Sequence, residues 1–195
     1  MEVPPITMSD QFTRELLNDL GPSIGEKLSA QNLLTSDQAS DALSSLAPIV
    51  LGSLKRKQEG LDDSGFSALL DQAGADEGHL DQLDSVLDLG SPNPGNLDAV
   101  LDTNTQDETV MALSKKLGVG KGVMKKLLPM LVPVILGMLA KKGRQEGGDS
   151  RSSGIGGILD RNGNGTMIDD IAGMVLGQKK GGFLQMILSM IFGKR

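Results

Sequence analysis

Cysteine, tryptophan and tyrosine are missing from this 195-residue chain, which has four phenylalanines and one histidine. Without cysteine the chain forms no disulfide and has no thiolate to act as a nucleophile or zinc ligand. The scarcity of aromatic rings argues against base stacking on nucleic acids, and a pI of about 4.8 means that the molecule as a whole repels phosphate. We therefore expect no nucleic-acid partner, and a core built from aliphatic residues and methionine.

Features typical of enzymes are also few. The single histidine, His79, lies in the acidic stretch DEGHLDQLD, where a solvated side chain is favoured over a general base. The segment GVGKG at 118–122 lacks the spacing of a phosphate-binding loop and has no predicted strand before it. The first residues, MEVPPITMSD, have neither the basic start nor the long apolar run of a signal peptide. We expect a non-enzymatic, cytoplasmic protein.

Charge is distributed unevenly along the chain. Residues 1–110 carry 20 acidic side chains against 5 basic ones, a net charge of −15, whereas residues 111–195 carry 5 against 14, a net charge of +9. The two surfaces could simply differ, or the two parts could attract each other within one chain. A third interpretation is head-to-tail association between molecules, because a heterologous contact repeats itself and builds rings or fibres.

An internal repeat is the most informative pattern. LSAQNLLTSDQASDALSSLAPIVLGSL (28–54) aligns without gaps with LSKKLGVGKGVMKKLLPMLVPVILGML (113–139), at an offset of 85 residues. Downstream, GFSALLDQAGAD (65–76) resembles GIGGILDRNGNG (154–165), at an offset of 89 residues. The sequence therefore predicts two diverged copies of one structural unit.

Apolar residues in both copies recur at three- and four-residue spacing, as in the stripe Leu43, Leu46, Val50 and Leu54, which predicts an all-α fold. Capping-box spacing at Thr35 with Gln38, and at Thr105 with Glu108, predicts helix starts near Ser36 and near Thr105. Pro48 and Pro133 fall inside apolar helices, where a proline removes a backbone hydrogen bond. We expect each core helix to be kinked or broken there.

Composition divides the chain into six segments. We predict an N-terminal helical arm at 1–20, a first helical repeat at 21–90 and a second helical repeat at 96–142. A Gly/Ser linker at 143–157, a calcium-loop-like turn and helix at 158–177, and an apolar C-terminal helix at 181–195 follow. The break between the two repeats is SPNPGN, at 91–96.

Two apolar segments could contact a membrane. The uncharged run 127–140 has 14 residues, whereas about 20 are needed to cross a bilayer, so a buried core helix is favoured. The C-terminal segment 183–195 could lie on a membrane surface, dock on its own fold or insert into a neighbouring molecule. We favour docking, with these residues as candidates for self-association: Phe183, Met186, Ile187, Met190, Ile191 and Phe192.

A calcium-loop-like pattern occurs in LDRNGNGTMIDDI (159–171), where oxygen-bearing side chains alternate before a glycine. The candidate ligands are Asp160, Asn162, Asn164, Thr166, Asp169 and Asp170, with Thr166 contributing its backbone carbonyl. Ile171 stands where a bidentate glutamate is expected, and two ligands are uncharged amides, so binding should be weak. The alternative is a tight turn with the two aspartates at the start of a helix. Calcium is the only cofactor that the sequence suggests.

These residues also carry a resemblance. LAPIVLGSLKRK and LVPVILGMLAKK, each preceded by a small helical unit, together with LDRNGNGTMIDDIAGMVLG, resemble the YidB-like bacterial proteins, a domain of unknown function. The resemblance covers most of residues 25–177, and its most specific element is LD-x-[ND]-G-[ND]-G-x-x-x-DD. The family usually has Asp where this chain has Asn162 and Asn164. The resemblance implies a helical, cytoplasmic bacterial protein and supplies no activity.

From these patterns we expect a scaffold protein that self-associates into a homo-oligomer or filament, through its oppositely charged halves and its apolar C-terminal helix. A weak calcium-binding interaction module is the alternative, and peripheral membrane binding through the C-terminal segment is a further one.

Overall fold

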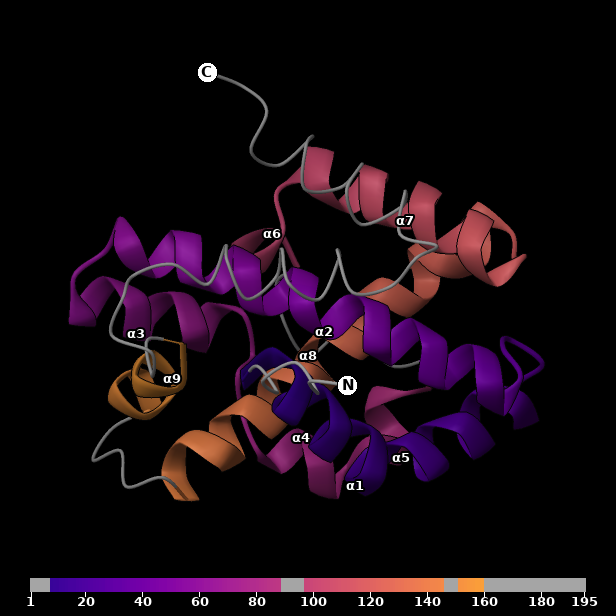
Figure 1. Ribbon diagram of the computed structural model, residues 1–195, viewed down its shortest axis with the longest axis horizontal. Helices are drawn as coiled ribbons and strands as arrows, with labels where there is room; N and C mark the ends of the chain where they lie inside the picture. Colours follow the sequence, from indigo (N-terminus) through magenta and orange to yellow (C-terminus); the bar gives the residue numbers. More distant parts are fainter. Residues whose placement is uncertain (1–7, 89–96, 146–150, 160–195) are drawn as a thin grey trace, which may run out of the picture.

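The computed structural model describes residues 8–88, 97–145 and 151–159, and these ranges contain helices and no strand. The all-α prediction is therefore confirmed for them. The longer helices are α1 (Met8–Ala30), α2 (Ser36–Glu59), α3 (Asp63–Gln72), α7 (Thr103–Leu117), α8 (Lys121–Gln145) and α9 (Arg151–Leu159). Three single-turn helices lie between α3 and α7, namely α4 (Gly78–Asp81), α5 (Leu83–Val86) and α6 (Leu97–Val100). Figure 1 shows their arrangement.

Side-chain caps explain where helices α2 and α7 begin. The side-chain oxygen of Thr35 accepts from the Gln38 N–H, and the Gln38 side chain accepts from the Thr35 N–H, so α2 starts at Ser36 as predicted. The prediction of a start near Thr105 is two residues late. Asp102 is the N-cap of α7, because its carboxylate accepts from both the N–H and the hydroxyl of Thr105.

The prolines lie inside helices that are continuous. Pro48 lies within α2, and Pro129 and Pro133 lie within α8. Neither helix is divided in two at its proline, so of the two outcomes expected from the sequence the break does not occur. Pro22 likewise lies inside α1, which runs across the predicted boundary between an arm ending at residue 20 and a repeat starting at residue 21.

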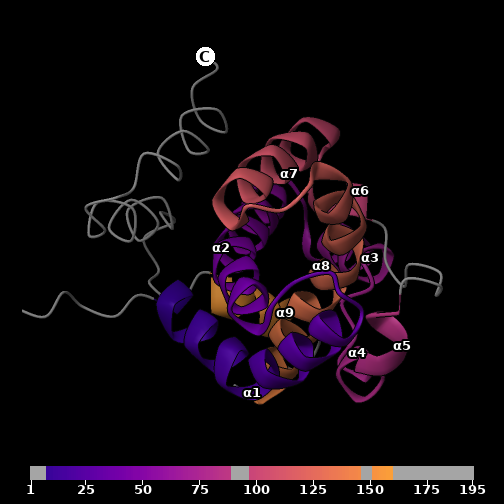
Figure 2. The same cartoon turned by 90° about the vertical axis from the view of Figure 1, so that its right-hand side faces the viewer.

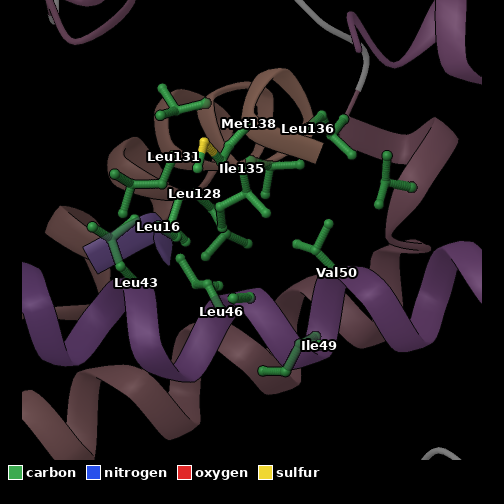
Figure 3. Close-up of a cluster of buried hydrophobic side chains, with 14 of the residues drawn as sticks. Leu16, Leu43, Leu46, Ile49, Val50, Leu128, Leu131, Ile135, Leu136 and Met138 are labelled. Atoms are coloured by element: carbon green, nitrogen blue, oxygen red, sulfur yellow. The ribbon is translucent and has the colours of Figure 1, made fainter. Parts of the chain in front are cut away.

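The core is shared by both repeats. On α2 the stripe Leu43, Leu46, Val50 and Leu54 is completely buried, as its spacing predicts. Figure 3 shows Leu43, Leu46 and Val50 directed toward Leu128, Leu131 and Ile135 of α8. One cluster of buried apolar side chains extends over both repeats. The described residues therefore form one packed unit in place of two separate domains.

Helix α8 is the centre of this unit. It packs against α2, α4, α5, α6, α7 and α9, and the end-on view of Figure 2 shows it in the middle of the bundle. By length and composition α8 is the one helix among the described residues that could cross a membrane, but 78% of its most apolar window is buried inside the protein. That burial is what the core helix of a packed bundle requires.

Helix order follows the sequence repeat. Helices α2 and α8 begin at Ser36 and Lys121, 85 residues apart, which is the offset of the alignment. Each follows another helix, α1 or α7, and each precedes a short one, α3 or α9. In addition α3 packs against α9. Helices α2 and α8 pack against each other as well, whereas α1 and α7 lie on opposite sides of the bundle in Figure 2.

The structure has helix at both ends of the predicted Gly/Ser linker, 143–157, and residues 146–150 lie outside the described residues. Residues 143–145 are the last of α8, and residues 151–157 belong to α9, which packs closely on α8. Gly143 and Gly154 meet at this crossing, where a Cβ on Gly154 would lie 2.6 Å from the carbonyl oxygen of Gly143. Glycine is needed here because two backbones touch, so a composition typical of a linker serves close helix packing instead.

Candidate interaction surfaces

The structure does not place the residues that the sequence singled out. The candidate calcium ligands Asp160, Asn162, Asn164, Thr166, Asp169 and Asp170 lie outside the described residues. The same holds for the candidate self-association residues Phe183, Met186, Ile187, Met190, Ile191 and Phe192. Within the described ranges no group of three or more histidine, aspartate or glutamate side chains could hold a metal ion.

Two weaker motifs have ordinary structural roles. GVGKG forms the turn between α7 and α8, where Gly118 has a left-handed backbone, with φ of 68°, and its N–H is bonded to the Ser114 carbonyl. The Ser114 hydroxyl donates to the Val119 carbonyl at 2.5 Å, which closes the turn. His79 is half-buried in α4 instead of solvated, and its Nδ1 has no hydrogen-bond partner.

Ion pairs connect the acidic part of the chain with the basic part. The C-terminal end of α8 binds α1 through Lys142 with Glu15, and through Lys141 with Asp19 at 4.0 Å. Arg144, one turn from Lys141, binds Glu77 at 2.5 Å. The attraction between the two halves therefore operates within one molecule for the charges at this end of α8.

Lys142 and Glu15 form the least exposed of these ion pairs. The Lys142 side chain is 8% exposed and that of Glu15 is 37% exposed. A buried ammonium group loses hydration that its partners must replace, so the pair fixes α1 relative to α8 and is costly to break on one side. Surface pairs such as Lys141 with Asp19 contribute little by comparison.

The other end of α8 presents lysines to solvent. We define the basic end as the exposed side chains around the turn between α7 and α8: Met111, Lys115, Lys116, Lys121, Lys125 and Lys126. Lys125 lies 3.3 Å from Asp107, and Lys116 donates to the Ser45 hydroxyl at 2.7 Å. Met111 is 54% exposed and lies one helical turn before Lys115, so an apolar side chain sits beside the lysines.

Exposed carboxylates lie close in the chain to the second exposed apolar side chain. We define the acidic end as Glu59, Leu61, Asp62 and Asp63, all exposed, at the turn between α2 and α3. Leu61 is 43% exposed, and Asp62 caps α3 by accepting from the Gly65 N–H at 2.7 Å. Leu61 and Met111 are the two large hydrophobic residues that the described part of the chain exposes most. Neither residue could be predicted as exposed from the sequence, because exposure depends on the fold.

Among the described residues, the capping carboxylate of α7 is the one group whose pKa clearly departs from its ordinary value. The Thr105 N–H holds the pKa of Asp102 below its ordinary value, the Thr105 hydroxyl and the Arg56 guanidinium act in the same direction, and partial burial opposes them. Arg56 belongs to α2 and Asp102 precedes α7, so this interaction also connects the two repeats. Its role is structural, since it fixes the start of α7.

Comparison with known proteins gives one result. No curated protein and no solved structure matches the chain significantly. A family model described as "Bacterial protein of unknown function (DUF937)" matches residues 14–142, the segment that runs from α1 to near the end of α8. This agrees with the resemblance to YidB-like proteins. The chain belongs to this bacterial family.

Proposed function

We propose that the chain is a non-enzymatic helical scaffold protein that associates with copies of itself. The proposal rests on the one-sided placement of charge. At its C-terminal end α8 uses Lys141, Lys142 and Arg144 to bind carboxylates of its own chain. At its N-terminal end the lysines of the basic end are exposed, although the chain as a whole has a net charge of −6.

Such a surface attracts an anionic partner, and the chain itself supplies one. Carboxylates are exposed on α2 and at the turn between α2 and α3, for example Asp37, Glu59 and Asp63. Complementary surfaces on identical molecules favour association at low salt, where charges act over about 30 Å, and weaken it at 1 M salt, where they act over about 3 Å. The apolar segment 181–195 is a second proposed contact, since its sequence suits insertion into a neighbour.

The test is the molar mass of the full chain in solution. Sedimentation velocity over a range of protein concentrations should show species larger than a monomer at about 10 mM salt, and a lower average mass at about 1 M salt. A chain without residues 181–195 should retain the salt-dependent part of the association. A monomer at every concentration and every salt would refute the proposal.

A further inference from the structure

The basic end and the acidic end have properties that suit them to each other. Each has one exposed large apolar side chain, Met111 or Leu61, in charged surroundings. After Met111 the exposed charges are lysines, while Asp107 and Glu108 lie one helical turn before it, and Asp107 is paired with Lys125. Next to Leu61 the exposed charges are carboxylates, with the half-buried Lys57 one turn before it. An apolar centre with a charged rim is the usual composition of a protein contact, and opposite rim charges select the partner and the orientation.

The positions of the two ends decide which kind of contact they can make. The turn between α2 and α3 lies at one end of the longest axis in Figure 1, and the turn between α7 and α8 lies toward the other. In one molecule the two surfaces therefore lie toward opposite ends. They can meet only between two copies, and a copy bound through its acidic end still has a free basic end.

We propose that copies of this chain associate head to tail, with the basic end of one molecule on the acidic end of the next. This inference rests on the proposed self-association and names the surfaces that produce it. Because the contact joins two different surfaces, it does not close a symmetric dimer. It extends into an open chain of molecules, or into a ring if the rotation between neighbours closes.

Two variants each remove one surface while leaving the described salt bridges and caps in place. The basic-end variant combines Met111→Ser with Lys115→Gln and Lys121→Gln. The acidic-end variant combines Leu61→Ser with Glu59→Gln and Asp63→Asn. All six side chains are exposed, so both variants should fold, which a helical circular-dichroism spectrum and a cooperative thermal transition would verify.

Control variants change the net charge by the same amount through substitutions at other exposed positions. Arg14→Glu lowers the net charge by the same two units as the basic-end variant, and Glu26→Gln with Asp81→Asn raises it by the same two units as the acidic-end variant. Both control variants should associate like the wild type. Each pair of exposed charges that is lost should weaken association by about 1.5- to 5-fold, and loss of the apolar centre should weaken it further.

Mixing the two variants gives the decisive result. Alone, each variant should lack the salt-dependent part of the association that the wild type shows at low salt. Together they retain one intact basic end and one intact acidic end, so mixing them should restore one salt-dependent contact for each pair of molecules. A mixture that gains no salt-dependent association, or control variants that lose association equally, would overturn the head-to-tail contact.

The same measurements separate this inference from the proposed function. If the wild type associates and both variants associate equally well, self-association stands and the contact lies elsewhere. If the wild type is always a monomer, the proposed function itself fails. If the wild type stays monomeric but floats with vesicles of anionic lipid, and the basic-end variant does not, the basic end binds a membrane surface and the inference is overturned.

Discussion

Replacing Gly143 by alanine tests the crossing of α8 and α9 directly. A Cβ at this position would lie 2.8 Å from the carbonyl carbon of Gly154 and 2.9 Å from the backbone nitrogen of Ile155. Both are backbone atoms, which cannot rotate away as the end of a side chain does. Accommodating the methyl group therefore requires the two helices to separate, or α9 to leave its position.

The expected cost follows from that separation. Carbon atoms pack best about 3.5–4.0 Å apart, so the helices must move by up to about 1 Å, which forfeits roughly a quarter to a half of the dispersion energy at each contact of the crossing. Overpacking of this kind costs about 1–3 kcal/mol, and the better helix propensity of alanine returns at most about 1 kcal/mol. We expect a net loss of about 1–2 kcal/mol, or about 2–8 °C in Tm for a chain of this size.

Urea denaturation and thermal melting of the full chain measure this loss. Gly122→Ala is the matched control, because Gly122 lies in the same helix and an added Cβ meets nothing within 4 Å. The control should leave stability unchanged or raise it by up to about 1 kcal/mol. In a flexible linker, Gly143→Ala would also stabilise slightly, by about 0.4–1 kcal/mol. A Gly143→Ala protein as stable as the wild type would therefore refute the crossing.

Three further predictions concern the caps, the ion pairs and the calcium-loop pattern. Asp102→Ala should lower the free energy of unfolding by about 1 kcal/mol in urea at neutral pH. Because the pKa of Asp102 is lowered by folding, its ionised form stabilises the fold above the ordinary pKa of 3.8, and the difference between this variant and the wild type should shrink as the pH falls through the lowered pKa. Glu15→Ala leaves the buried Lys142 ammonium without this partner and should lower the free energy of unfolding by about 1–3 kcal/mol. Lys142→Met keeps the apolar stem and should lower it less. Equal losses of stability would contradict the argument from burial. Calorimetry should detect weak calcium binding by the wild type at millimolar concentrations and none by Asp160→Ala, and an absence of heat from both would exclude the calcium proposal.

The features that the sequence predicts best are local ones. Helix α2 is an example, because its apolar stripe Leu43, Leu46, Val50 and Leu54 and its cap at Thr35 all lie within one continuous segment. Apolar residues spaced three or four apart predict that one face of a helix is buried, whatever that face packs against. The prediction for α7 is nearly as good, but Asp102 supplies a cap three residues before Thr105, and two cap candidates so close together compete.

Features that depend on distant segments are harder to predict. Residues 143–157 contain Gly and Ser in the proportions of a linker, and only the approach of Gly154 to Gly143 shows that the glycines allow packing. Met111 and Leu61 could not be identified as exposed, because an apolar residue in a helical sequence is as consistent with the core as with the surface. The charge asymmetry was evident, but which lysines are paired within the chain required the structure.

The packing of α2 against α8 has a consequence for synthesis of the chain. About 80 residues separate Leu54 from Ile135, so at roughly 5–20 residues per second the apolar face of α2 waits about 4–16 s on the ribosome before its partner emerges. During that time the nascent chain exposes apolar side chains that are buried in the folded protein. The net negative charge of its first 110 residues keeps the chain hydrated and makes neighbouring nascent chains repel each other. The acidic composition of the part that is synthesised first thus opposes aggregation before α2 and α8 can pack together.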